Sequence, residues 1–250
     1  MTTSLSAIRS ELTQKLLQYH TERNLGHLGS CLSSLDILTA LFWGPLKQDD
    51  HFILSKGHAA SLLYLILNQK GLMTDAELAG SCRDGSIFGA HPPSTVPTPH
   101  PWWGFASGSL GCGVGLGSGV ALAKKIRGEQ SQVYVLISEG DLNEGSTWEA
   151  LHFAAQNQLS NLHVLFDHNK TQALGSISNI YSLHHLEVSL DSMGWDMSRQ
   201  NGHDVQSIHF SKASGPKPHF YIFDTRKNFG FEDRLTPVEA HYKNPPVVKP

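Results

Sequence analysis

The sequence predicts an α/β protein with a doubly wound, mostly parallel sheet and helices on both faces. Two observations support this prediction. Residues 133–138 (VYVLIS) and 162–167 (LHVLFD) are short apolar runs that flank a predicted helix at residues 146–158. Strands that alternate with helices in this way usually form a parallel sheet. The 250-residue chain is also 40% hydrophobic, enough for one substantial core. We therefore expect a single domain over residues 1–250.

The first half of the chain is predicted to be mainly helical. Apolar side chains recur at helical spacing near the N-terminus, a glycine-bearing turn follows at residues 26–29, and Ser33 is expected to cap the next helix. Residues 81–107 are rich in Pro, Gly and Ser without a period, which predicts a long loop. The helices predicted in this half cover residues 4–22, 33–43, 59–70 and 108–125.

The second half is predicted to complete the sheet. Residues 195–198 and 220–224 have the character of further short strands, with residues 205–211 between them. The last seven residues, 244–250 (NPPVVKP), predict an extended C-terminal tail.

The composition argues against several classes of protein. A net charge of −3 does not favour a general nucleic-acid-binding surface, and no apolar run reaches the length of a membrane span. The N-terminus lacks the basic and then apolar pattern of a secretion signal. Three widely spaced cysteines are typical of reduced thiols rather than of a disulfide framework. We expect a cytoplasmic protein with no nucleic-acid partner and no membrane segment.

Polar residues follow the two predicted central strands. Glu139 and Gly140 come directly after the first strand, and Asn169 and Thr171 come after the second. The carboxyl ends of neighbouring parallel strands meet at one edge of the sheet, where ligands bind. A carboxylate, a carboxamide and a backbone carbonyl suit Mg²⁺ or Ca²⁺, and a glycine lets the backbone approach a phosphate. Taken alone, the pattern also fits ordinary loop and capping residues.

Five segments, in the same order along the chain, resemble the N-terminal, thiamine-diphosphate-binding half of transketolases, especially those made as two chains. The last of them is similar to a D-G-H-D-like segment of the family. The segments are GHLGSCLSSLDILTALF, DDHFILSKGHAASLLY, SGSLGCGVGLGSGVALAKK, EGDLNEGSTWEALHFAAQNQLSNLHVLFDHNKTQALG and NGHDVQSIHF.

This resemblance implies a function and a set of partners. It implies the diphosphate-binding domain of the thiamine-diphosphate-binding fold, and transfer of a two-carbon ketol or related acyl unit between sugar or sugar-phosphate substrates. The implied cofactors are thiamine diphosphate and Mg²⁺ (or Ca²⁺). The pyrimidine-binding domain and its catalytic glutamate would lie on a second subunit, most simply in an α₂β₂ assembly, because no such domain follows in this sequence.

The resemblance also implies roles for individual residues. The expected metal ligands are Glu139, Asn169 and Thr171, and the expected catalytic residues on the substrate side are His27, His91 and His241. His58 would contact the diphosphate, although it could instead cap the helix that follows it. Cys112 is expected to serve packing. The other expected cofactor contacts are Gly108, Ser109, Leu110, Gly140, Asp141, Glu144 and Asn169.

The sequence departs from the family at two places. Ser138-Glu139-Gly140 stands where the family has Gly-Asp-Gly, so Gly140-Asp141 is a rival Gly-Asp pair. The 30 positions from 139 to 169 match the family spacing and favour Glu139 as the metal ligand. Lys227-Asn228 stands where Lys-Gly is common. In the long loop, His100 is a rival to His91.

Two other functions stay open on the sequence. The altered metal motif is compatible with a catalytically silent regulatory or scaffold subunit. A subunit of a decarboxylating 2-oxoacid acyl transferase or dehydrogenase is the other alternative. The set of histidines at positions 27, 58 and 91 favours sugar chemistry over the latter.

Overall fold

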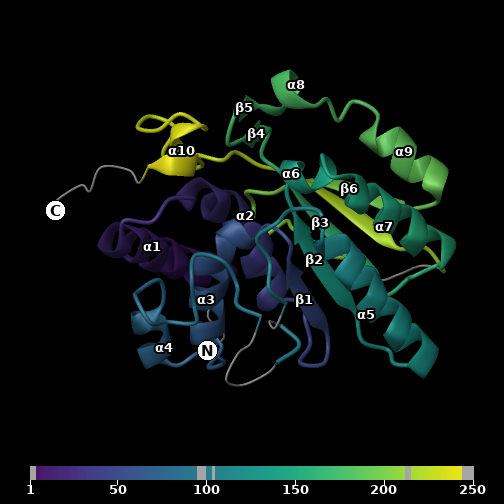
Figure 1. Cartoon of the computed structure of the whole chain (residues 1–250), viewed down its shortest axis with the longest axis horizontal. Coiled ribbons are helices and arrows are strands. Elements are labelled where there is room, and N and C mark those ends of the chain that lie inside the picture. The colour runs from purple at the N-terminus through teal and green to yellow at the C-terminus, as the bar shows by residue number, and fades with distance from the viewer. Residues whose placement is uncertain (1–3, 95–99, 103–104, 212–214, 244–250) are drawn as a thin grey trace.

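The computed structural model describes residues 4–94, 100–102, 105–211 and 215–243. Its centre is a five-stranded parallel sheet, which confirms the predicted α/β class (Figure 1). The strands run in the order β1 (His51–Leu54), β2 (Val133–Ile137), β3 (Leu162–His168), β7 (His219–Asp224) and β6 (Asp196–Asn201). A separate antiparallel pair joins β4 (Thr171–Gln172) to β5 (Gly175–Ser176).

Helices cover both faces of the sheet (Figure 1). Side chains alternate between the faces along each strand, so Phe52 and Tyr134 join one core while Ile53 and Val135 join the other. The first core contains residues of α1 (Leu5–Arg23), α2 (Leu28–Phe42) and α3 (Ala60–Gln69). The second contains residues of α5 (Gly113–Arg127), α7 (Gly145–Gln156) and α9 (Leu186–Met193).

The beginnings of two predicted helices were wrong. Helix α2 begins at Leu28 rather than at Ser33, which is buried inside it. Its N-cap is His27 in the left-handed region at φ 66°, and the His27 amide donates to the His241 carbonyl at 2.7 Å. A tertiary hydrogen bond thus replaces the local side-chain cap that the sequence indicated. Helix α5 begins at Gly113 rather than residue 108, after a turn with Gly111 at φ 88°.

Several short elements were missing from the prediction. Strand β1, the 3₁₀ turn η1 (Gly57–Ala59), α4 (Asp75–Gly80) and α8 (Ile177–Ile180) were not expected, and neither were β4, β5 and α9. The strand expected at residues 195–198 is the longer β6, while residues 205–211 form no strand. The predicted loop carries no helix in its described part, and the tail at 244–250 lies outside the described residues.

The topology brings the predicted site residues to one edge. Strands β2 and β3 are neighbours, with Ile137 paired to Phe166, so the segments that follow them emerge together. The first of these segments forms α6 (Glu139–Leu142) and the second forms β4. Helix α10 (Glu239–Tyr242) packs on α2 beside this edge. None of the helices in the described part of the chain has the length and apolarity that a bilayer crossing requires.

Candidate active site

A cavity of about 250 Å³ opens at the carboxyl ends of β2 and β3. Ten of the residues predicted for the site contribute to its wall, although they come from distant parts of the sequence. The predicted residues that do not contribute are Ser109, Asp141 and Glu144. The lining residues are His27, Ser30, His58, His91, Gly108, Leu110, Ser138, Glu139, Gly140, Asn169, Thr171, Gln172, Ala173, Lys227 and His241.

Four histidines of the cavity wall lie close together. The ring centroid of His27 lies 4.5 Å from that of His241, 5.4 Å from that of His58 and 6.3 Å from that of His91. Burial lowers the pKa of all four rings, to about 4 for His241 and well below the usual range for His58. The rings are therefore neutral at pH 7, each with one N–H donor and one nitrogen acceptor.

Three polar atoms in the cavity wall have no partner within the described residues. They are Nδ1 of His27, Nδ1 of His241 and Oγ of Ser30, all of them buried. Buried polar atoms normally form hydrogen bonds, so each unpaired one needs an explanation. These three fit a polar ligand whose oxygen or nitrogen atoms complete their hydrogen bonding.

Three other residues of the cavity wall, Glu139, Asn169 and Thr171, can supply oxygen donors. The Glu139 carboxylate is buried and accepts from the Lys170 amide at 2.5 Å, with Nδ1 of His168 at 3.3 Å. Burial raises the pKa of Glu139, and the neighbouring His168 ring opposes that rise. Oδ1 of Asn169 accepts from the Thr171 amide at 3.1 Å. A nearby cation would stabilise the buried carboxylate.

These donors fit a divalent cation that also binds a ligand. Carboxylate, carboxamide and carbonyl oxygens are what Mg²⁺ and Ca²⁺ take, and Glu139, Asn169 and Thr171 supply one of each. No group of three or more His, Cys, Asp or Glu side chains in the described ranges is arranged to hold a metal. A cation here would therefore need further oxygen atoms from a ligand or from water.

Lys227 is a wall residue that the prediction missed. It follows β7, is 3% exposed, and donates from Nζ to the Thr171 carbonyl at 3.1 Å. Burial, reinforced by the charge of Lys56, lowers its pKa to about 8. The sequence did contain a signal for Lys227, because it lies just after a strand in a segment that departs from the family pattern. A buried ammonium beside three oxygen donors equips this side of the cavity for an anion.

A buried ion pair contacts Ser30, a residue of the cavity wall. Nζ of Lys56 pairs with the Asp167 carboxylate, and both side chains are fully buried. Lys56 also donates to the Ser30 carbonyl at 3.1 Å, while Ser33 donates to Asp167 at 2.5 Å. The pair links the ends of β1 and β3 to α2. It joins residues 111 positions apart, so local sequence patterns do not reveal it.

Asp141, the rival metal ligand, is placed differently from Glu139. Its carboxylate is fully buried and accepts from Oγ of Ser55 at 2.5 Å, from the Gly111 amide at 2.9 Å and from the Ser138 amide at 2.8 Å. These bonds tie the loop before α5 to the start of α6. Its acceptor positions are thus engaged within the protein. A side chain at Gly140 would require the end of the Leu110 side chain to move.

The structure also separates the two candidate histidines of the long loop. His91 lines the cavity, and its carbonyl accepts from the Tyr64 hydroxyl at 3.0 Å. His100 does not line it. Its ring packs on Trp102 at 4.9 Å, and its Nδ1 accepts from the Trp102 amide at 3.2 Å. The geometry favours His91.

A larger cavity, of about 660 Å³, lies at the other end of the sheet. Gln132, Asn161 and His163, at the beginnings of β2 and β3, contribute to its wall. None of the predicted site residues lines it. Since ligands of open parallel sheets bind at the carboxyl ends of the strands, we assign the site to the smaller cavity.

Known proteins similar to this chain fit the geometry. A family model described as "Transketolase, thiamine diphosphate binding domain" matches residues 6–241. The A subunit of apulose-4-phosphate transketolase from Phocaeicola vulgatus is 31% identical over 237 residues, 89% of this chain and 83% of that protein. The protein of the same name from Actinobacillus succinogenes is 33% identical over 232 residues, 88% of this chain and 83% of that protein.

Longer transketolases match as well. Human transketolase is 33% identical over 216 residues, which are 81% of this chain and 33% of that protein. Among solved structures, a Pichia stipitis transketolase variant in complex with fructose 6-phosphate superposes with a TM-score of 0.82 and 27% identity, over 91% of this chain and 37% of that one. Campylobacter jejuni transketolase superposes with a TM-score of 0.78 and 26% identity, over 90% of this chain and 38% of that one.

Proposed function

The chain belongs to the transketolase family and carries its thiamine diphosphate binding domain, and from this premise we propose its function. It would be one subunit of a two-chain enzyme. That enzyme would transfer a two-carbon ketol unit between sugar phosphates. One observation supports this function above the alternatives. A single cavity is lined both by four neutral histidines and by oxygen donors with a buried lysine. The histidines suit sugar hydroxyls, and the oxygen donors with the lysine suit a metal-bound diphosphate.

The diphosphate side would hold the cofactor. Glu139, Asn169 and the Thr171 carbonyl would bind Mg²⁺ or Ca²⁺, and the cation would take its remaining oxygen atoms from the diphosphate and water. Lys227 and His58 would contact the diphosphate directly. Thiamine diphosphate, when bound, supplies the carbanion chemistry, and the protein orients it and excludes water.

The histidine side would hold the substrate. His27, His91 and His241 are neutral, so they can donate N–H groups to the carbonyl and hydroxyl oxygens of a sugar and accept protons from them. The unpaired Nδ1 atoms of His27 and His241 mark positions where such oxygens would bind. This set favours a polyhydroxylated substrate over a small 2-oxoacid.

The catalytic glutamate and the pyrimidine-binding domain would come from a partner subunit. Among the described residues, Glu139 is the sole carboxylate in the cavity wall, and it is engaged at the diphosphate side. The two apulose-4-phosphate transketolase relatives cover nearly the same length as this chain, and their designation as A subunits implies another subunit. Because they are named for apulose 4-phosphate, a ketose phosphate is the donor class to test first. We also propose a cytoplasmic location, which the sequence favours because its N-terminus lacks the pattern of a secretion signal.

The test is two-carbon transfer by the reconstituted enzyme. The chain is mixed with its partner subunit, thiamine diphosphate, Mg²⁺ and apulose 4-phosphate labelled at its first two carbons. With an aldose phosphate added as acceptor, label should appear in the ketose phosphate formed from it, and omission of the cofactor should abolish the transfer. Release of CO₂ from a 2-oxoacid would instead identify a decarboxylating enzyme. Cofactor binding without turnover of any tested ketose phosphate would identify a silent subunit.

A further inference from the structure

The segment Asn201-Gly202-His203-Asp204 has a defined structure but no part in the site described above. Oδ1 of Asn201 accepts from the His203 amide at 3.0 Å, and Oδ1 of Asp204 accepts from the Gln206 amide at 3.2 Å. A side chain at Gly202 would overlap the methyl group of Thr225. The turn after β6 is therefore built to lie against the segment that leaves β7.

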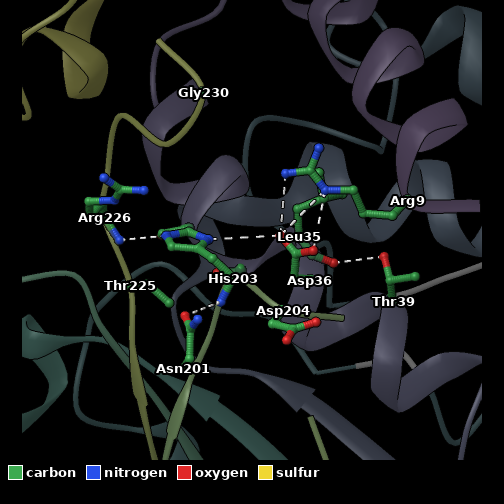
Figure 2. Close-up of polar contacts among 12 residues, drawn as sticks. Arg9, Leu35, Asp36, Thr39, Asn201, His203, Asp204, Thr225, Arg226 and Gly230 are labelled. Carbon is green, nitrogen blue, oxygen red and sulfur yellow. Dashed lines mark hydrogen bonds and ion pairs between the residues drawn. The ribbon is translucent and has the colours of Figure 1, made fainter. Parts of the chain in front are cut away.

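His203 makes the direct connection between these two segments. Its Nε2 accepts a hydrogen bond from the Arg226 amide at 2.7 Å (Figure 2). A backbone amide can only donate, so Nε2 carries no proton and the proton of the neutral ring is on Nδ1. Nδ1 faces Oδ2 of Asp36 at 3.8 Å. The hydrogen bond to Arg226 therefore requires one particular tautomer, and the carboxylate favours it.

The ring of His203 is held on its other sides too. It stacks on the ring of Phe229, with centroids 3.6 Å apart and an angle of 13°. Asp36 is itself fixed by Arg9, whose Nε lies 3.2 Å from Oδ1 (Figure 2). The guanidinium groups of Arg9 and Arg226 lie 5.5 Å and 5.0 Å from the centre of the Phe229 ring. These contacts leave the imidazole one orientation, with Nε2 toward the Arg226 amide.

The residue after Arg226 is Lys227, the buried cation of the active-site cavity. The segment that carries it is attached on both sides. Thr225 donates from Oγ1 to Asp167 at 2.5 Å, and Nδ2 of Asn228 donates to the Leu235 carbonyl at 2.7 Å. The Arg226 amide is the attachment point nearest to Lys227 on the β7 side.

We propose that His203, oriented by Asp36, is a positioning residue that sets where Lys227 presents its ammonium group to the cofactor diphosphate. This role rests on the proposed function. His203 does not line the cavity and touches no reacting group. It acts through the backbone of Arg226. The four-residue turn after β6 thereby contributes to cofactor affinity from outside the site.

The test compares three substitutions, two of them at the same ring. His203→Phe keeps the stack on Phe229 and removes the acceptor, whereas His203→Gln can return an acceptor oxygen near the position of Nε2. His209→Phe is the matched control, since His209 is exposed nearby. Thiamine diphosphate with Mg²⁺ is titrated calorimetrically into the two-subunit complex. We expect His203→Phe to weaken binding about two- to tenfold, the effect of one lost hydrogen bond. His203→Gln should recover most of this loss, and His209→Phe should bind as wild type does.

A double-mutant cycle shows whether the effect passes through Lys227. Lys227→Met alone should weaken binding, and adding His203→Phe to it should cause no further loss. Additive losses, or a His203→Phe protein with lowered thermal stability and unchanged affinity, would overturn the positioning role. A wild-type complex that binds no thiamine diphosphate would refute the proposed function and this role with it.

The tautomer gives a second readout that does not depend on activity, and its NMR measurement needs no partner. In ¹⁵N NMR spectra of the full chain, His203 should carry its proton on Nδ1 at neutral pH. Asp36→Asn should shift the balance toward protonation at Nε2 and weaken cofactor binding in the complex. A His203 ring protonated at Nε2 in the wild type would contradict the hydrogen bond on which the proposal depends.

Discussion

Glu139 and Asp141 are two residues apart and have opposite surroundings. Asp141 is saturated by hydrogen bonds from Ser55, Gly111 and Ser138, as expected for a carboxylate that stabilises a loop. Glu139 faces the cavity beside Asn169 and Thr171, where a charge without a cation is costly. The sequence spacing favoured Glu139 as the ligand, and the geometry independently supports that choice.

The two carboxylates should therefore respond differently to removal. Asp141→Ala leaves several buried donors unpaired and should lower the free energy of unfolding by about 3 kcal/mol or more. Glu139→Ala should leave stability nearly unchanged or raise it, because it removes a buried charge. It should also weaken Mg²⁺-dependent binding of thiamine diphosphate by at least about tenfold, or about 1.4 kcal/mol. Thermal unfolding and calorimetry measure the two effects. Normal cofactor binding by Glu139→Ala, with loss of binding in a stable Asp141→Ala, would reverse the assignment.

The histidines of the cavity should fall into two groups, one that acts on the substrate and one that binds the cofactor. His27→Ala and His91→Ala remove donors to the substrate, so we expect turnover to fall about 10- to 1000-fold with little change in cofactor affinity. His58→Ala should instead raise the cofactor concentration needed for half activity. Steady-state kinetics against cofactor and donor separate the two patterns. His100→Ala is the control and should be silent. A damaging His100→Ala beside a silent His91→Ala would mean that the long loop was misassigned.

At the scale of elements, the sequence predicted what depends on local pattern. Strands β2, β3 and β7 are continuous apolar runs because both faces of the sheet are covered. Strand β1 has only four residues, too few to show a period in the sequence, so it was missed. The beginning of α2 was missed because the hydrogen bond from the His27 amide goes to a residue more than 200 positions away.

Strand β3 carries a buried histidine outside the active site, and it should make the fold sensitive to acid. Burial lowers the pKa of His163 to about 3, with His219 adding to the effect. In the unfolded chain His163 takes up a proton below pH 6.5, whereas in the folded chain it stays neutral until about pH 3. Stability therefore falls as the pH falls through this window, by up to about 1.4 kcal/mol per pH unit for this group.

This sensitivity can be isolated by substitution. Between pH 7 and pH 5 the free energy of unfolding should fall less in His163→Phe than in the wild type, by about 2 kcal/mol. This difference does not depend on how stable the variant is at pH 7. The measurement is denaturant unfolding at the two pH values. His152→Phe, on the exposed side of α7, should show the same change in free energy of unfolding with pH as the wild type. Equal slopes for His163→Phe and the wild type would show that His163 is not kept neutral by the fold.

At the scale of the whole molecule, the site depends on long-range contacts that no local pattern encodes. The resemblance predicted Glu139, Asn169 and the histidines as site residues, whereas the position of Lys227 in the cavity wall and the Lys56–Asp167 pair are seen only in the fold. The residues of the cavity wall are also relevant to whether a second subunit is needed. In the described residues it contains no carboxylate besides Glu139 that could act on the far end of the cofactor.

The isolated chain should accordingly bind the cofactor diphosphate without turning over substrate. Mixing it with the partner subunit should produce ketol transfer, because the partner would bring the catalytic glutamate to the cofactor's pyrimidine ring. Native mass spectrometry of the active sample should find two copies of each subunit. The activity should titrate to a plateau at equal amounts of the two chains, and a partner with its glutamate replaced by glutamine should assemble but remain inactive. Measurable two-carbon transfer by the purified chain alone would contradict the divided site.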